Sequence, residues 1–338
     1  MVELVAMSGK LEQRRLQSVA NNSFSITLPK WWIKKYNLTK GSSILLQEDK
    51  GFLKLFPSNR VEGRVTLNLD EFDSLDYVKY LVRTYYIQGV EAATITSSHP
   101  MKPDEKKELR KLREELAGAE IVDEAPESIT INFTHIMEDQ PLEASLKSIA
   151  DFMATIVRDA TRALLEGEED IAIEVEGRME EIGRHYRWLM RRIVLTAIKP
   201  SLKNEYNFRD LISFVLAARD LYAAIRHLTY YVRYVRSSHL AGEDLDEVKD
   251  LSGKLIQLIR EAVEAFTTKN MGKVFWVLRF SREVRRQQEV FLQKLFSRHE
   301  DKEALILAMI VQELRRITSY CVGLVDAAAN RVAITSLP

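Results

Sequence analysis

The chain has 338 residues, of which 46% are hydrophobic and 29% are charged, and its 49 Lys and Arg balance its 49 Asp and Glu. These values are ordinary for globular chains with a hydrophobic core, and the length is compatible with two or three domains. The single cysteine, Cys321, excludes an internal disulfide and a cysteine-only metal site, and it favours a reducing, cytoplasmic compartment.

The sequence also lacks signals for secretion and membrane insertion. Its first residues, MVELVAMSGKLEQRR, have no apolar core of the kind found in signal peptides. The longest uncharged apolar runs, such as ALILAMIV, are much shorter than a membrane-spanning helix. We therefore expect a cytoplasmic protein without membrane insertion.

Charge is unevenly distributed along the chain. Residues 1–57 contain nine Lys and Arg against four Asp and Glu, a balance of +5. Residues 58–140 contain ten against seventeen, a balance of −7, and the remaining residues have a balance of +2. Such asymmetry is typical of a chain in which one domain faces a polyanion.

The expected elements change along the chain. Residues 11–57 contain short β-like runs. Residues 63–135 alternate, and their pattern predicts the order βαβαββ in a small α/β domain without a glycine-rich phosphate loop. From residue 142 to residue 337, only Pro200 interrupts long apolar patterns with a period of 3.6, so we predict that this region is entirely helical.

The stretch NNSFSITLPKWWIKKYNLTKG, at residues 21–41, combines a strand, an Ile-x-Leu-Pro-Lys pattern, one helical turn and a glycine. Pro29 suits the first position of the helix, where its missing N–H would have no partner. With the strands around it, this stretch resembles the AbrB/SpoVT family of DNA-binding domains. The resemblance implies that two chains swap hairpins to form one β-barrel, and the small size of the unit independently favours a homodimer. The expected barrel core is Leu28, Trp32, Ile33 and Leu38.

In this family, Arg and Lys on the first strand and the adjoining loop face double-stranded DNA, and Arg14 and Arg15 stand at the matching place. Arginine can bind phosphate or guanine, whereas lysine attracts DNA independently of sequence. The alternative is a solvated basic face that binds nothing. The residues predicted to bind DNA are Lys10, Arg14, Arg15, Asn21, Asn22, Lys30 and Lys34.

The helical region contains an internal repeat. Residues 158–193 align without a gap on residues 260–295, a shift of 102, and residues 221–227 align on residues 314–320, a shift of 93. This collinear pattern predicts two related units of three helices each, at about 141–240 and 245–338. The alternative is a chance alignment of amphipathic helices.

The segment ATRALLEGEEDIAIEVEGRMEEIGRHYRWLMRRI has a helix, a short turn and a long charged helix, and it resembles the PhoU family of phosphate-uptake regulators. Archaeal chains of this kind join an AbrB-like head to a PhoU-like tail of two three-helix bundles. We therefore predict a multidomain chain. Its domains are an AbrB-like DNA-binding and dimerisation domain at 1–60, an α/β linker domain at 61–140 and a PhoU-like helical domain at 141–338.

PhoU domains often hold metal ions with carboxylates on facing helices, but Gly183, Arg226 and Arg285 stand where carboxylates are expected. Because a positive charge competes with a cation, we predict no metal site. Arg226 and Arg285 are instead candidates for binding an anion such as phosphate; the alternative is that each pairs with a nearby glutamate. The candidate positions of an anion site or a degenerate metal site are Glu180, Glu181, Arg226, His227, Glu283 and Arg285.

The two resemblances together imply a transcriptional regulator linked to phosphate uptake, in which a signal or partner at the helical tail changes the DNA affinity of the head. The alternative is an adaptor that does not bind DNA and docks on a phosphate transporter or signalling protein. No Ser-His-Asp order, phosphate-binding loop or carboxylate pair indicates catalysis. We therefore expect neither an enzyme nor a bound cofactor.

Overall fold

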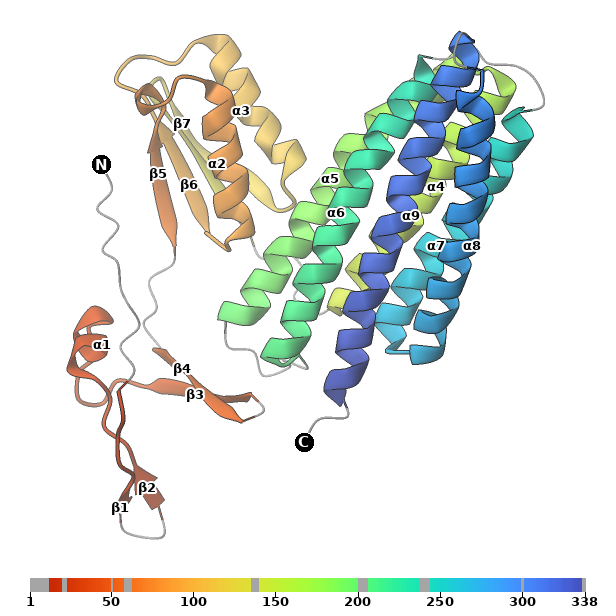
Figure 1. Cartoon of the computed structure of the whole chain (residues 1–338). Helices are drawn as coiled ribbons and strands as arrows, with labels where there is room; N and C mark the ends of the chain where they lie inside the picture. Colours follow the sequence, from red (N-terminus) through yellow and green to blue (C-terminus); the bar gives the residue numbers. More distant parts are fainter. Residues whose placement is uncertain are drawn as a thin grey trace. The chain divides into compact units, whose positions relative to one another are not determined.

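The computed structural model describes residues 12–19, 23–49, 51–57, 63–134, 140–199, 206–237, 244–298 and 301–335. The chain divides into two compact units, Met1–Val61 and Glu62–Pro338. The first unit contains short strands and one short helix, and the second contains an α/β part followed by six long helices (Figure 1). Within the described ranges, every helix is too short or too polar to span a bilayer.

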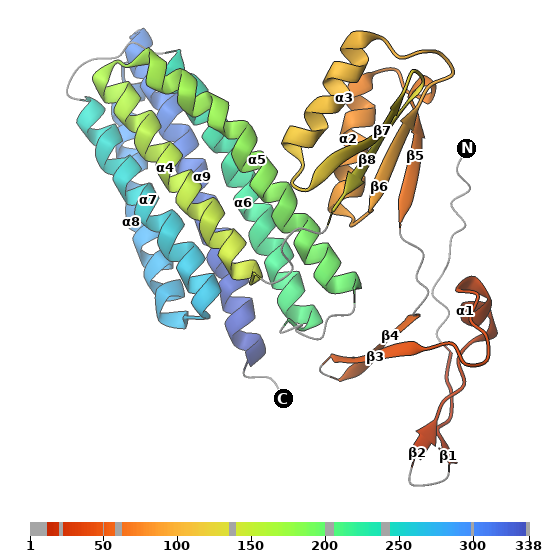
Figure 2. The same ribbon diagram turned by 180° about the vertical axis from the view of Figure 1, so that it is seen from behind.

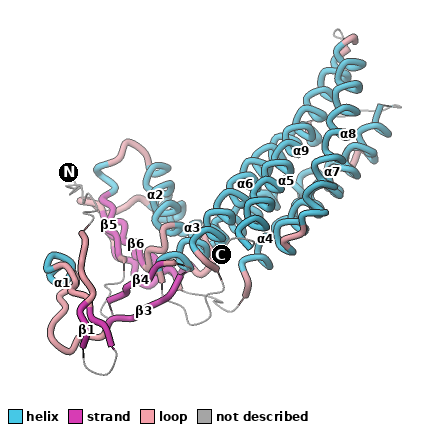
Figure 3. The backbone as a smooth tube through the Cα atoms, turned by 60° about the horizontal axis from the view of Figure 1, so that its bottom comes forward, coloured by secondary structure: helices cyan, strands magenta, loops and turns pink. Residues whose placement is uncertain are grey.

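The first unit contains two antiparallel hairpins and a helix of six residues (Figure 3). The hairpins form separate two-stranded sheets, so the described residues of a single chain do not close the predicted barrel. Of its expected core, Leu38 is buried, whereas Leu28, Trp32 and Ile33 are only half-buried. The elements are β1 (Gln17–Val19), β2 (Ser23–Ser25), α1 (Lys30–Lys35), β3 (Ile44–Asp49) and β4 (Phe52–Pro57).

The α/β part of the second unit has a four-stranded sheet in the order β5-β6-β8-β7 (Figure 2). Its elements follow the predicted order βαβαββ, with a short 3-10 helix at Leu69–Glu71. Strands β5 and β6 are parallel, and the other neighbouring strands are antiparallel. The elements are β5 (Arg64–Asn68), α2 (Leu75–Ile87), β6 (Ala92–Thr96), α3 (Pro103–Glu115), β7 (Ala119–Ala125) and β8 (Ser128–Phe133).

Strand alternation puts the core of the α/β part on one face of its sheet. Ile129, Ile131 and Phe133 are buried at alternate positions of β8 and belong to one apolar cluster with Val78 of α2 and Leu109 of α3. The sheet is therefore covered by these two helices on one face only.

The predicted helical region contains six helices in its described residues. They are α4 (Leu142–Glu166), α5 (Glu169–Ile198), α6 (Phe208–Arg236), α7 (Asp244–Thr268), α8 (Met271–Phe296) and α9 (Lys302–Thr335). The bounds of α4 and α7 differ by the predicted shift of 102, and so do the first residues of α5 and α8. Gly167 and Lys269, which the same shift relates, both have left-handed backbones, with φ of 69° and 52°. The sequence repeat is therefore a structural repeat.

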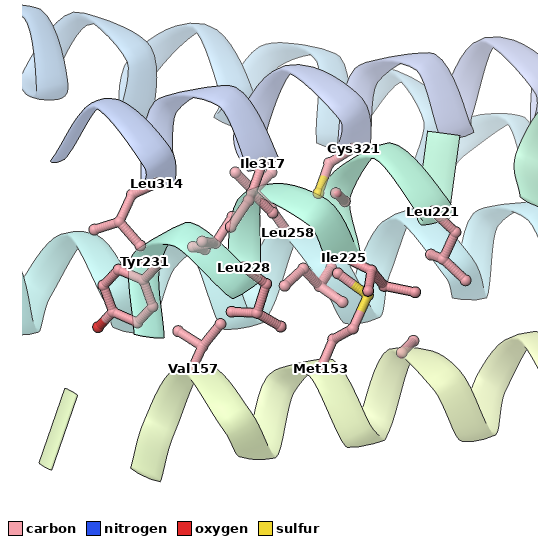
Figure 4. Packing of buried hydrophobic residues seen from close by; sticks show 14 of the residues in the cluster. Met153, Val157, Leu221, Ile225, Leu228, Tyr231, Leu258, Leu314, Ile317 and Cys321 are labelled. Atoms are coloured by element: carbon pink, nitrogen blue, oxygen red, sulfur yellow. The ribbon is translucent and has the colours of Figure 1, made fainter. Parts of the chain in front are cut away.

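The two repeats share a single hydrophobic core. Its buried cluster contains residues from all six helices, and Figure 4 shows Met153 of α4, Leu228 of α6, Leu258 of α7 and Ile317 of α9 side by side. The helices form the two predicted units of three, α4 to α6 and α7 to α9, and the two units pack together around one core. The reason is that α6 packs on α9 and α4 packs on α7, so the apolar faces of the two repeats meet.

Candidate functional site

The residues predicted to bind DNA are solvent-accessible where the structure describes them. Arg14, Arg15, Lys30 and Lys34 are exposed, and Arg14 forms an ion pair with the exposed Glu12. Lys10, Asn21 and Asn22 lie outside the described residues. The accessible cations can attract a polyanion.

Several large apolar side chains of the same unit are exposed to solvent. Leu16 and Phe24 are each 69% exposed, and Leu46 and Leu53 of the second hairpin are 66% and 65% exposed. A folded unit of this size gains stability by burying such groups. The first unit of a single chain therefore has an incomplete core.

The predicted anion or metal positions of the helical region do not form one cluster. Glu180, Glu181, Glu283 and Arg226 are exposed, and Arg285 is half-buried. Glu181 lies 3.8 Å from His185, one turn further along α5, and not beside an arginine.

Neither Arg226 nor Arg285 has an ion-pair partner within the described ranges, so the expected pairing with Glu181 or Glu283 is not found. The buried Nε of Arg285 also has no hydrogen-bond partner among the described residues. Across the described segments, no three His, Cys, Asp or Glu side chains lie close enough together to hold a metal ion. Anion binding at Arg226 and Arg285 therefore stays a prediction.

Of the predicted anion or metal positions, His227 makes the shortest polar contact among the described residues. Its Nδ1 is 2.6 Å from Oε2 of Glu313, which is 8% exposed and projects from α9. The imidazole also stacks on Tyr320, with ring centres 5.5 Å apart and an interplanar angle of 18°. Helices α6 and α9 are therefore joined by a shielded histidine–carboxylate contact.

The internal repeat relates the residues of this contact to one another. The shift of 93 takes His227 to Tyr320 and Asp220 to Glu313. Asp220 of α6 and Tyr320 of α9 line the same small cavity. We call these four residues, Asp220, His227, Glu313 and Tyr320, the α6–α9 seam.

The side chain of Asp220 fits between α6 and α9 because the residue opposite it is a glycine. The carboxylate of Asp220 lies directly against Gly323, where an added Cβ would be 2.7 Å from its Cγ. Burial raises the pKa of Asp220, the nearby Arg219 opposes this shift, and Asp326 adds to it. Burial also raises the pKa of the Cys321 thiol to about 12, so this neighbour is not a reactive thiolate.

Arginines of α5 attach the helical region to the α/β part. Arg191 is fully buried, and its Nη1 donates to the carbonyls of Tyr86 at 2.5 Å and Val90 at 2.9 Å. Nε and Nη2 of Arg187 donate to the carbonyl of Glu115, at 3.2 and 3.0 Å. Tyr86 and Glu115 lie in the last turns of α2 and α3, so the guanidinium groups complement the negative ends of both helices.

Sequence reasoning missed Asp220, Glu313 and Arg191. A usable signal existed for the first two, because the same shift of 93 that aligned 221–227 with 314–320 also aligns Asp220 with Glu313. No such signal existed for Arg191, whose acceptors are backbone carbonyls of the preceding α/β part.

No protein-family model matches the sequence, and no curated protein sequence matches it. Among solved structures, PhoU from Pseudomonas aeruginosa is 17% identical with a TM-score of 0.51, and the likeness covers 58% of this chain and 96% of that chain. The phosphate transport system regulatory protein PhoU from Streptococcus pneumoniae is 14% identical with a TM-score of 0.49, covering 58% of this chain and 95% of that chain. The C-terminal helical region thus has a fold similar to that of PhoU from Pseudomonas aeruginosa.

Proposed function

We propose that this protein is a non-enzymatic adaptor that regulates phosphate uptake by binding a transporter or signalling protein through its helical region. The observation that carries this proposal is the PhoU-like arrangement of the six helices, which covers nearly the whole of the Pseudomonas aeruginosa PhoU chain. The buried contacts of the α6–α9 seam and the protonated Cys321 are consistent with a rigid binding scaffold.

Deleting the coding sequence tests this adaptor function in the cells that contain the protein. We expect phosphate uptake to lose its dependence on external phosphate, and affinity-purified full-length protein to carry subunits of a phosphate transporter or its signalling partner. Unchanged uptake, together with no such subunit above the level of an unrelated bait, would contradict the adaptor function.

The effector in this proposal is an anion such as phosphate, bound at Arg285. This guanidinium is half-buried, and its Nε has no hydrogen-bond partner within the described residues. A ligand that binds only the folded state raises its stability, by about 2.7 kcal/mol at a hundred times its Kd. Inorganic phosphate should therefore raise the melting temperature of the wild type but not of Arg285→Gln, with chloride at equal ionic strength as the control. An equal response of both proteins would contradict this effector site.

We propose DNA binding by the first unit as a second candidate function. We propose that two chains swap their hairpins, because pairing would cover Leu16, Phe24, Leu46 and Leu53. The exposed cations would then form a basic surface on the dimer for double-stranded DNA.

A salt series of DNA affinity tests this second candidate. The wild type should bind DNA with an affinity that falls steeply with salt. In a plot of the logarithm of the binding constant against the logarithm of the salt concentration, Arg14→Ala/Arg15→Ala should reduce the slope by roughly 0.9 for each phosphate that the variant no longer neutralises. The matched control is Arg158→Ala/Arg162→Ala, which removes two arginines of α4. A monomeric wild-type protein, or no binding at low salt, would leave the adaptor as the only candidate.

A further inference from the structure

An open groove of about 600 Å³ lies between α7 and α8. Leu251, Val290 and Phe291 supply its apolar surface. The charged residues around it are Asp246, Glu247, Asp250, Glu283 and Arg286. The groove therefore combines an apolar surface with an acidic border.

The internal repeat shows how the equivalent face of the first repeat is used. The shift of 102 takes Trp188 of α5 to Val290 of α8. Trp188 packs against the apolar cluster of the α/β part, and the neighbouring Arg187 and Arg191 bind its carbonyls. Val290, in contrast, is 61% exposed. One face of this duplicated fold is covered by another part of the chain, and its counterpart is open within the described residues.

The two faces also differ in charge. The same shift replaces Ala144, Ser145 and Ser148 of the first repeat with Asp246, Glu247 and Asp250 of the second. It also replaces Arg187 with Glu289 and Arg191 with Gln293. The face on α5 donates hydrogen bonds to carbonyls, whereas its counterpart on α7 and α8 presents carboxylates.

Local cations neutralise only part of this acidic border. Glu247 pairs with Lys294 at 3.1 Å, and Asp250 pairs with Lys254 at 2.5 Å. Asp246 and Glu283 form no ion pair with any described residue of the chain. The groove therefore keeps two carboxylates without an ion pair, against one arginine of its lining, Arg286, and they lie next to the exposed side chain of Val290.

We propose that this groove binds a basic amphipathic helix of a partner protein. A bulky apolar side chain of that helix would lie over Val290, where the first repeat has the larger Trp188, and Lys or Arg would approach Asp246 and Glu283. An amphipathic helix that lays its apolar side into a groove is a common mode of recognition, and complementary charge selects the partner. This assignment rests on the proposed adaptor function and names the surface and the kind of partner.

Site-specific photo-crosslinking in cells tests the groove with the full-length protein. A benzophenone amino acid at position 290 should crosslink to one partner, and the crosslinked peptide should be a helical segment rich in Lys and Arg. The control position is Phe275, which lies on the same helix, is 64% exposed and does not line the groove. No crosslink at 290 above the level at 275, or a crosslink to an acidic segment or to a second copy of this chain, overturns the proposal.

Charge reversal provides the second measurement. Asp246→Lys/Glu283→Lys should reduce the crosslink yield at least tenfold, whereas Glu174→Lys/Glu303→Lys, which changes two exposed acids elsewhere, should not. Equal melting temperatures of both variants would exclude misfolding, and an unchanged yield in Asp246→Lys/Glu283→Lys would overturn the proposal.

The same experiment separates the groove from the adaptor function. If the charge-reversal variant still copurifies with phosphate-transport proteins, the groove assignment is wrong and the adaptor function stands. If position 290 crosslinks to a basic helix of a protein unrelated to phosphate uptake, the groove is correct and the phosphate adaptor function fails.

Discussion

His227 of α6 and Tyr320 of α9 stack on each other, and the shift of 93 residues makes them equivalent positions of the internal repeat. The repeat also relates Asp220 to Glu313, so the seam has two equivalent pairs of unequal chemistry. The carboxylate of Glu313 lies 2.6 Å from the imidazole of His227, whereas the carboxylate of Asp220 lies against Gly323 and lines a small cavity together with Tyr320. Equivalent positions of the seam therefore carry different polar groups and make different contacts.

Glu313→Leu should destabilise the protein because it leaves Nδ1 of His227 shielded and without its partner. A buried polar group that loses its hydrogen bond costs about 1–3 kcal/mol, which chemical denaturation can measure. The control is Glu181→Leu, because Glu181 and His185 are a more exposed pair at 3.8 Å, and we expect a change within about 0.5 kcal/mol. His227→Leu/Glu313→Leu should recover part of the loss; a double variant as unstable as the sum of both single variants would contradict the coupling.

Gly323→Ala should destabilise the protein because the new methyl group would overlap the Asp220 carboxylate. Overpacking of this kind costs about 1–3 kcal/mol. Gly253→Ala is the matched control, since Gly253 lies inside α7 with no atom within 4 Å of an added Cβ. That control should be stabilised by about 0.5–1 kcal/mol, because alanine favours a helix more than glycine does. A Gly323→Ala variant as stable as the wild type would show that the Asp220 carboxylate does not need the space beside Gly323.

The sequence was sufficient to predict features that depend on local pattern. The apolar period of 3.6 predicted the helical region, and the shift of 102 places the turn at Gly167 on the turn at Lys269. The order βαβαββ was readable from alternation and glycine positions. These features depend on residues close together in the chain, so composition and spacing contain the necessary information.

The parts that could not be predicted depend on how distant segments pack. Helix period shows that Arg191 lies on one face of α5, but not that backbone carbonyls of Tyr86 and Val90 face it. The contact between Asp220 and Gly323 likewise depends on the packing of α6 on α9. The family pattern drew attention to Arg226 and Arg285 and away from Asp220, because it aligns positions and does not show which side chains meet.

Asp220→Asn should change how stability depends on pH. The pKa of Asp220 in the folded protein is raised above 3.8, with burial as the main cause, so the folded state binds this proton more tightly than the unfolded state does. Ionisation of this carboxyl therefore lowers the free energy of unfolding as pH rises through the pKa that the group has in the folded protein. Below pH 3.8 the carboxyl is protonated in both states, and its ionisation has no effect. The asparagine variant should be more stable than the wild type at neutral pH, and the difference should shrink as pH falls toward 3.8. Unfolding free energies across this range measure it, and a constant difference would contradict the assignment.

Arg191→Leu should loosen the attachment of the α/β part to α5. It would leave the carbonyl of Val90 without this donor, whereas the carbonyl of Tyr86 would still accept from the N–H of Gly89 at 3.1 Å. A buried group left unpaired costs about 1–3 kcal/mol. We expect a loss of roughly 1–3 kcal/mol in urea unfolding, with faster hydrogen exchange near the C-terminal end of α2. Arg191→Lys should recover little of the lost stability, because lysine lacks the planar fork of the guanidinium and loses its proton more readily when buried.

Arg184→Leu is the control, since Arg184 is an exposed arginine of the same helix, and this variant should change the free energy of unfolding by less than about 0.5 kcal/mol. Equal losses from Arg184→Leu and Arg191→Leu, or unchanged exchange in α2, would show that the buried guanidinium does not hold the two parts together.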